Sequence, residues 1–193
     1  MSELVFDIET VGDIHNLQSM KVTVVSIYDY DTNVYSSFEE HELGDMWPFF
    51  EKADRIIGYN SESFDVPILN RYYTGDLTIF PHLDLLKVIR ESVGKRFKLN
   101  DVAKATLQIE KSADGLQAQK WFQEGKLAEI KKYCEQDVKV TKEIYDFGRK
   151  NKMLYYPMIT GEIQPFAVNF EPPHEPVNAS GQQSTGINLT LPL

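Results

Sequence analysis

Two acidic side chains near the start of the sequence have the type and spacing of metal ligands. Segment Glu3–Thr10 predicts a strand, and Asp7 and Glu9 interrupt its apolar residues. Alternate side chains of a strand point to opposite faces, so these two carboxylates would lie side by side. Burying adjacent carboxylates costs several kcal/mol unless cations compensate. A bound divalent metal explains the pair, although strands that end in solvent also carry Asp-x-Glu.

A second candidate is an aspartate on the apolar face of the clearest helix in the sequence. Between Leu127 and about Lys150, apolar residues recur at three- and four-residue spacing, and Asp137 falls on this stripe. Tyr133 precedes it by one helical turn, so its hydroxyl can reach the same cavity. The alternative is that Asp137 lies at the edge of the stripe, in contact with solvent.

The third candidate is Asp65, which follows the short apolar segment Arg55–Asn60 at a predicted strand-to-helix junction. A carboxylate there can simply stabilise the N-terminus of the helix, by a few tenths to about 1 kcal/mol. Junctions at the carboxyl ends of strands are also where open α/β sheets bind ligands. Asn60 can cap the helix, contact a substrate, or do both.

These candidates need a sheet and flanking helices to bring them together. Alternating and β-branched residues predict an antiparallel meander of strands, followed by a short central strand and one brief strand. These strands are Glu3–Thr10, Lys21–Tyr30, Val34–His41, Arg55–Asn60 and Leu77–Phe80. The predicted helices are Asp45–Ala53, Ser61–Tyr73, about 84–93, 99–107 and 127–150. The expected fold class is α/β with a mixed sheet.

Composition and charge limit the functional classes. A chain of 193 residues, 42% of them hydrophobic, is expected to form a single folded domain. Its net charge of −9 argues against a protein that coats nucleic acid through many basic contacts, whereas bound cations offset such charge in a metal-dependent enzyme. Basic residues nevertheless outnumber acidic ones in the segment Lys87–Lys111. This segment is our candidate strand-binding surface; the alternative is a solvated face enriched by chance.

Several features bear on location and organisation. No stretch approaches the roughly 18 apolar residues needed to span a bilayer, and early acidic residues interrupt any secretory signal, so we expect a cytoplasmic protein without membrane contact. The lone Cys134 is expected to be a small core residue. We expect a catalytic domain over residues 1–152 and an extension packed on it over 153–170. Residues 171–193, rich in proline and polar residues, predict a flexible tail.

Three segments together resemble the exonuclease motifs of the DEDD superfamily, in the same order and spacing. They are Val5-Phe-Asp-Ile-Glu-Thr10, Ile57-Gly-Tyr-Asn-Ser-Glu-Ser-Phe-Asp-Val-Pro-Ile68 and Tyr133-Cys-Glu-Gln-Asp-Val138. The second, with Asn60 followed by Phe64-Asp65, resembles the proofreading domain of family B DNA polymerases in particular. Tyrosine four residues before the last aspartate is similar to the tyrosine branch, DEDDy; the histidine branch has histidine where this chain has Lys132.

The resemblance covers roughly residues 1–148 and implies a ribonuclease H-like fold. It implies a 3′-to-5′ exonuclease that releases nucleoside 5′-monophosphates from single-stranded 3′ ends, with DNA as the first expectation. By this likeness Asp7, Glu9 and Asp137 hold one divalent cation. Asp7 holds a second together with Asp65, directly or through water. All-oxygen ligands suit two Mg²⁺ or Mn²⁺ ions.

Other site residues follow from the motifs and the basic segment. A tyrosine hydroxyl ordinarily stays protonated at neutral pH, so Tyr133 is expected to orient the attacking water rather than remove its proton. The candidate substrate contacts are Thr10, Asn60, Phe64, Lys95, Arg96 and Lys98. Aromatic side chains could stack on terminal bases, although core packing is the expected role of each. These aromatic residues are Phe64, Phe97 and Trp121.

Two other functions remain open at this point. The same fold supports endonucleases that cut RNA in hybrids or branched DNA, but Tyr133 and segment Asn60–Asp65 favour the exonuclease. A function of a different class is a binding module that uses the acidic pocket and the basic segment to recruit a polymerase or helicase. The sequence does not choose between DNA and RNA, because that choice depends on contacts at the 2′ position. Proofreading, DNA repair and the degradation of short oligonucleotides are all compatible with it.

Overall fold

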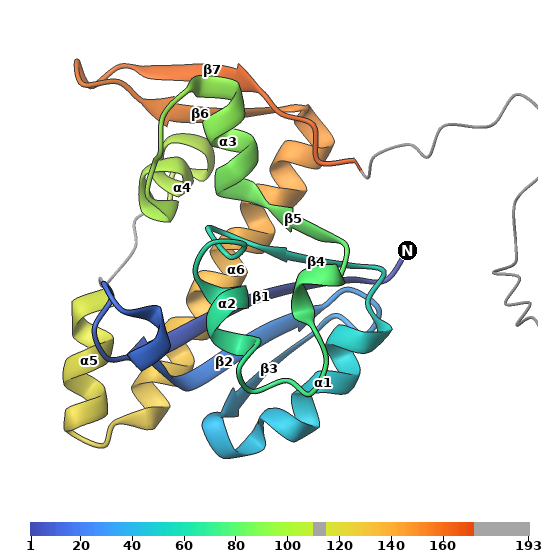
Figure 1. Ribbon diagram of the computed structural model, residues 1–193. Coiled ribbons are helices and arrows are strands. Elements are labelled where there is room, and N and C mark those ends of the chain that lie inside the picture. The colour runs from blue at the N-terminus through green and yellow to red at the C-terminus, as the bar shows by residue number, and fades with distance from the viewer. Residues whose placement is uncertain (110–114, 172–193) are drawn as a thin grey trace, which may run out of the picture.

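The computed structural model describes residues 1–109 and 115–171 (Figure 1). A five-stranded sheet in the order β3-β2-β1-β4-β5 forms its centre. The strands are β1 (Glu3–Val11), β2 (Lys21–Asp29), β3 (Val34–Glu39), β4 (Arg55–Gly58) and β5 (His82–Asp84). Strands β1 to β3 pair antiparallel, whereas β4 pairs parallel with both β1 and β5. The sheet is mixed, as the sequence predicts.

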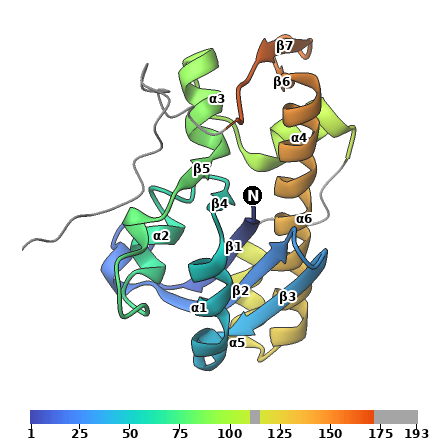
Figure 2. The ribbon, with the colours of Figure 1, turned by 90° about the vertical axis from the view of Figure 1, so that its right-hand side faces the viewer.

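Helices cover both faces of this sheet (Figure 2). The helices are α1 (Leu43–Lys52), α2 (Asp65–Leu69), α3 (Leu85–Val93), α4 (Leu99–Leu107), α5 (Gly115–Gln123) and α6 (Leu127–Asn151). Along β1, Leu4, Phe6 and Ile8 belong to the core that α1 and α2 form on one face. Val5 belongs to the core of the opposite face, with residues of α3, α4 and α6. The alternation of β1 therefore directs Asp7 and Glu9 toward the α6 side.

Two predicted elements are wrong. Residues 77–80 do not form a strand; Leu77–Ile79 is a 3-10 turn, closed where Asp76 accepts a hydrogen bond from the backbone of Thr78. The edge strand begins five residues after the predicted start, as β5. The helix predicted over Ser61–Tyr73 shrinks to the five residues of α2. Asn60 adopts a left-handed conformation with φ of 66°, and this turns the chain before a helix can begin.

A β-hairpin of β6 (Met153–Pro157) and β7 (Ile163–Ala167) follows α6 and packs on α4 (Figure 1). The hydroxyl of Thr106 in α4 donates to the carbonyl of Tyr155 at 3.2 Å and accepts from its N–H at 3.1 Å. The sequence predicts only a packed extension over residues 153–170, without this hairpin, and it does not predict α5. The predicted tail, apart from Glu171, lies outside the described residues.

A buried charge network joins the first strand to the last described residues. Arg55 donates to the Glu3 carboxylate at 2.5 Å, to the Tyr145 hydroxyl at 2.6 Å and to the carbonyl of Phe170 at 2.8 Å. The Phe170 ring lies against Gly148, where any side chain would overlap it. Removing one partner from a buried ion pair costs about 3–5 kcal/mol, so the network fixes these four segments to one another.

Candidate active site

The end of β1 extends past its parallel neighbour. Val5 pairs with Ile57, and β4 ends one residue later at Gly58, so Asp7 and Glu9 lie beyond the carboxyl end of β4. The register with β2 shifts between Glu9 and Thr10. Such bulges often redirect side chains beside active sites. The strand end is thus shaped to present side chains at the edge where open α/β sheets bind ligands.

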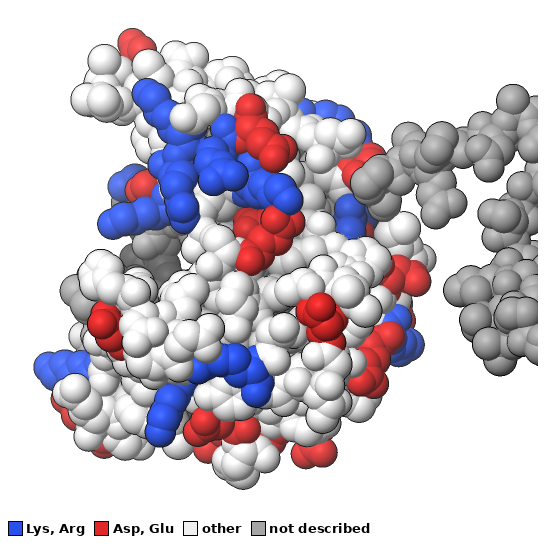
Figure 3. Space-filling view, viewed as in Figure 1, with Lys and Arg blue, Asp and Glu red and all other residues white. Residues whose placement is uncertain are grey.

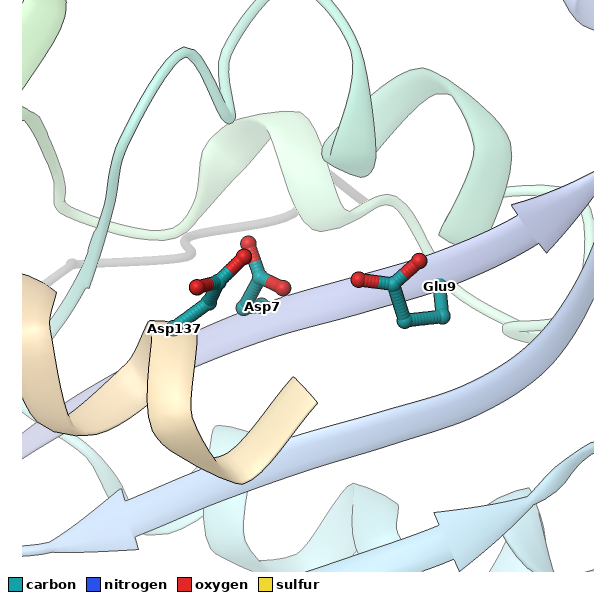
Figure 4. Close-up of side chains that lie close together, drawn as sticks. All are labelled: Asp7, Glu9 and Asp137. Atoms are coloured by element: carbon teal, nitrogen blue, oxygen red, sulfur yellow. The ribbon is translucent and has the colours of Figure 1, made fainter. Parts of the chain in front are cut away.

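Three carboxylates from two elements converge here (Figure 4). Asp7 and Glu9 project from β1 and Asp137 from α6, and one oxygen of each lies within 4.8 Å of the others. Two ligands of one Mg²⁺ are at most about 4.2 Å apart, since each bond is about 2.1 Å. A small side-chain rotation therefore suffices for all three to hold one ion. The all-carboxylate donor set fits Mg²⁺ or Mn²⁺.

Cys134 lies beneath this cluster and is a core residue, as predicted. Its Sγ donates to the carbonyl of Asp7 at 3.3 Å. Burial raises the pKa of the thiol well above its ordinary value, and the negative charges of Asp7, Glu9 and Asp137 raise it further. The thiol therefore stays protonated and packs under the carboxylates rather than serving as a ligand.

Asp65 is the first residue of α2, and only 5% of it is exposed. Burial raises the pKa of this carboxyl to about 7, and the negative charge of Asp84 adds to the effect. The backbone N–H of Ile8 lowers the pKa in opposition. The carboxyl of Asp65 therefore lies against β1 at the residue between Asp7 and Glu9. It stands outside the group of three carboxylates that can share one ion.

Asp84 holds the loop between β4 and α2 in place, a role that was not expected from the sequence. Its buried carboxylate accepts the backbone N–H of Asn60 at 2.8 Å and that of Glu62 at 3.1 Å. It also caps α3 by accepting the N–H of Leu86 at 2.9 Å. In the sequence, Asp84 directly precedes an apolar periodic run. That pattern predicts a helix cap but not the bonds to the loop.

The substitution Gly58→Ala tests how closely this loop is packed. A methyl group at Gly58 would overlap the buried side chain of Ser61. We expect the variant to lose about 1–3 kcal/mol of unfolding free energy, the usual effect of overpacking. Because the loop leads to Asp65, turnover should fall as well. Urea denaturation and a nuclease assay measure the two effects.

Gly44→Ala is the matched control, since a methyl group there meets nothing within 4 Å and the residue lies in α1. It should gain up to about 1 kcal/mol of helix stability. Wild-type stability and turnover in Gly58→Ala would show that the loop adjusts freely.

Tyr133 lies one helical turn before Asp137 on the buried side of α6, and 8% of it is exposed. Its ring packs edge to face against Trp121 of α5, with 6.0 Å between centroids. Trp121 therefore has a packing role beside the site. Thr10 is half-buried and follows Glu9 across the bulge.

The other predicted substrate contacts lie around the rim. Lys95, Arg96 and Lys98 are exposed in the segment between α3 and α4. Arg96 donates to the side-chain oxygen of Asn60 at 2.6 Å, so the structure brings these two together. Phe64 packs against the core beneath α1 and α2, and the ring of Phe97 packs against Tyr156. Lys111, the last residue of the basic segment, lies outside the described residues.

Comparison with known proteins identifies the family. The RNase_H_2 family model, of the RNase H superfamily, matches residues 4–147. The chain belongs to the RNase H superfamily. The mixed sheet flanked by helices is accordingly an RNase H-like fold. RNase H-like nucleases use divalent metals, and the acidic cluster of this chain offers the carboxylate oxygens that such metals bind.

A solved relative shares the fold of this RNase H superfamily protein. It is the family B DNA polymerase from the hyperthermophilic archaeon Pyrobaculum calidifontis, with a TM-score of 0.61 and 18% sequence identity. The match covers 76% of this chain and 24% of the polymerase, so the chain spans about a quarter of the polymerase's length. No curated protein sequence matches the chain. None of its described helices combines the length and the apolar character needed to cross a membrane.

Proposed function

We propose that this RNase H superfamily protein is a metal-dependent 3′-to-5′ exonuclease of the tyrosine branch. It removes nucleoside 5′-monophosphates from single-stranded 3′ ends, with DNA as the first candidate substrate. The observation that carries the proposal is the convergence of Asp7, Glu9 and Asp137, with Tyr133 one turn away on the same side of α6. Proofreading and repair are the processes that such an activity would serve.

Each residue has a defined task in this proposal. Asp7, Glu9 and Asp137 would hold one divalent cation, and Asp7 with Asp65 a second. When bound, these cations supply Lewis-acid activation of water and offset the charge that develops on the leaving 3′-oxygen. Tyr133, as a protonated donor and acceptor, orients the attacking water by a hydrogen bond. The packing of α6 on β1 and β2 holds the acidic and phenolic groups at fixed positions.

Digestion of matched single-stranded DNA and RNA, labelled at the 5′ end, tests the proposal. The reactions contain Mg²⁺, Mn²⁺ or a chelator and are resolved on a gel. We expect a metal-dependent ladder that shortens from the 3′ end, and the sugar that supports it identifies the substrate. Internal cuts from the earliest times would instead indicate an endonuclease. Binding of metal and strand without any cleavage would indicate a recruiting module.

Tyr133→Phe is expected to leave a slow enzyme. The ring and its packing on Trp121 remain, and only the hydroxyl that orients water is removed. Loss of one positioned hydrogen bond reduces kcat by roughly 10- to 1,000-fold. KM should change little, because the hydroxyl contacts the attacking water rather than the strand. Steady-state kinetics on a 3′-fluorescent oligonucleotide measures both constants, and an unchanged kcat would remove Tyr133 from the mechanism.

A further inference from the structure

A small basic hollow lies outside the carboxylate cluster, between the β4–α2 loop and α3. Its volume is about 100 Å³. It is lined by three basic residues, two acidic residues and three others: Lys87, Arg90, Arg96, Glu62, Asp84, Asn60, Ser63 and Leu86. Figure 3 shows lysine and arginine side chains gathered over α3 and the chain that leads toward α4. On a chain with a net charge of −9, the hollow keeps a surplus of positive charge, which favours an anionic ligand.

Hydrogen bonds prepare one wall of this hollow. The side-chain oxygen of Asn60 accepts from Arg96 at 2.6 Å and from the Ser63 hydroxyl at 2.9 Å. These two donors orient the amide so that its NH₂ group, with two further donors, is directed away from them. The left-handed backbone of Asn60 is held by its N–H bond to Asp84. Backbone strain of this kind persists where the surroundings enforce it, often at ligand sites.

The charges in the hollow are only partly neutralised. Lys87 pairs with Glu62 at 2.6 Å. Within the described part of the chain, neither Arg90 nor Arg96 forms an ion pair. Two guanidinium groups and an amide thus face one small space. Arginine matches phosphate geometry with paired N–H donors, which makes this a suitable phosphate site.

The hollow and the candidate active site share one support. Asp84 binds the backbone of the loop that carries Asn60 and also caps α3, which carries Lys87 and Arg90. Asn60 is five residues from Asp65, a span of at most roughly 18 Å in an extended chain. A single strand whose 3′ end reaches the carboxylates would therefore need only a few nucleotides to reach the hollow.

We infer that this hollow is a backbone-phosphate subsite, which binds internal phosphodiester groups of the strand whose 3′ end lies at the carboxylates. The inference rests on the proposed function for the direction of the strand. It makes Arg90 and Arg96 sequence-independent contacts that position the substrate. Because they bind phosphate rather than a base or the 2′ position, they serve DNA and RNA alike.

Fluorescence anisotropy with 5′-fluorescein-labelled dT12, in the presence of chelator to prevent cleavage, tests the subsite. The double variant Arg90→Gln/Arg96→Gln is expected to bind at least about tenfold more weakly than wild type. The slope of log affinity against log salt should fall by about 1.4, since each lost contact to a single strand accounts for about 0.7. Equal affinities and slopes for variant and wild type would overturn the inference.

Three comparisons sharpen this experiment. Lys52→Gln/Lys150→Gln removes the same charge from two exposed lysines, at the end of α1 and in the last turn of α6, and should lose far less affinity. An equal loss of affinity in this control would show that the arginine variant binds weakly only because its net charge has changed. With unlabelled competitors from dT2 to dT8, the affinity of the wild-type protein should increase with the length of the oligonucleotide. The Arg90/Arg96 variant should lack this increase. A gain that depends only on a terminal 5′-phosphate would contradict an internal phosphate contact.

The binding readout is independent of turnover. If the wild-type chain fails to shorten any strand from the 3′ end, the exonuclease proposal fails while the binding data still decide whether the subsite exists. If turnover is present and the arginine variant binds dT12 as tightly as wild type, only the subsite is wrong.

Discussion

Asp7→Asn is expected to lower kcat by at least about 1,000-fold, equivalent to about 4 kcal/mol of transition-state stabilisation. Asp7 is the carboxylate that the proposal assigns to both cations, so its loss weakens both positions. The amide keeps the shape of the side chain but is a poor ligand for Mg²⁺. Digestion of a labelled oligonucleotide in saturating Mg²⁺ measures the effect over the required range.

The unfolding free energy of Asp7→Asn distinguishes a loss of catalysis from misfolding. In chelator, removing one of three clustered negative charges should raise the unfolding free energy by about 1 kcal/mol, since like charges this close together repel one another. A variant that is inactive and at least as stable as wild type therefore reports on chemistry. Glu135→Gln, an exposed substitution on α6, is the control and should match wild type in both measurements. Activity of Asp7→Asn within tenfold of wild type would exclude the proposed site.

The metal-free protein is expected to lose stability as the pH rises from about 4 to 7. The pKa of Asp65 is raised from 3.8 to about 7 by burial, so within this window the folded state holds a proton that the unfolded state has released. Folding therefore takes up a proton, and the unfolding free energy falls as pH increases. At about 1.4 kcal/mol per pH unit, the loss reaches up to about 4 kcal/mol.

Asp65→Asn should remove this loss, because the amide does not ionise. Urea denaturation in chelator at pH 5 and pH 8 measures the slope for both proteins. Mg²⁺ should restore wild-type stability at pH 8 and do less for the variant, since a ligand that binds only the folded state stabilises it. Parallel pH profiles for the two proteins would show that Asp65 is solvated rather than buried.

The candidate site could be recognised in the sequence because catalysis places charged residues where packing favours apolar ones. Carboxylates interrupt a buried strand at Asp7 and an apolar helical stripe at Asp137, where packing alone would select hydrophobic residues. Each anomaly has a weak structural explanation by itself. Their convergence within 4.8 Å is what no local pattern can establish. The alternation of β1 correctly predicted the face of Asp7 and Glu9.

Elements fixed by distant contacts were less predictable. Segment Ser61–Phe64 has polar residues that suit a helix entrance, but the backbone N–H groups of Asn60 and Glu62 donate to Asp84, and these bonds hold the segment as a turn. The strand at His82–Asp84 has only three residues, too few for an alternating pattern to be recognised. Strand β6 is held by a hydrogen bond from Thr106 and by pairing with β7. Local sequence preferences do not encode either contact.

The network around Arg55 has a consequence for where this protein can be cut. The family match ends at residue 147, yet the carbonyl of Phe170 is one of the acceptors of the buried guanidinium and its ring covers Gly148. A chain ending just after α6 would keep every catalytic candidate. It would, however, expose to water one side of the charge cluster that anchors β1. The unit of sequence similarity is thus shorter than the unit of folding, which includes the return segment through Phe170.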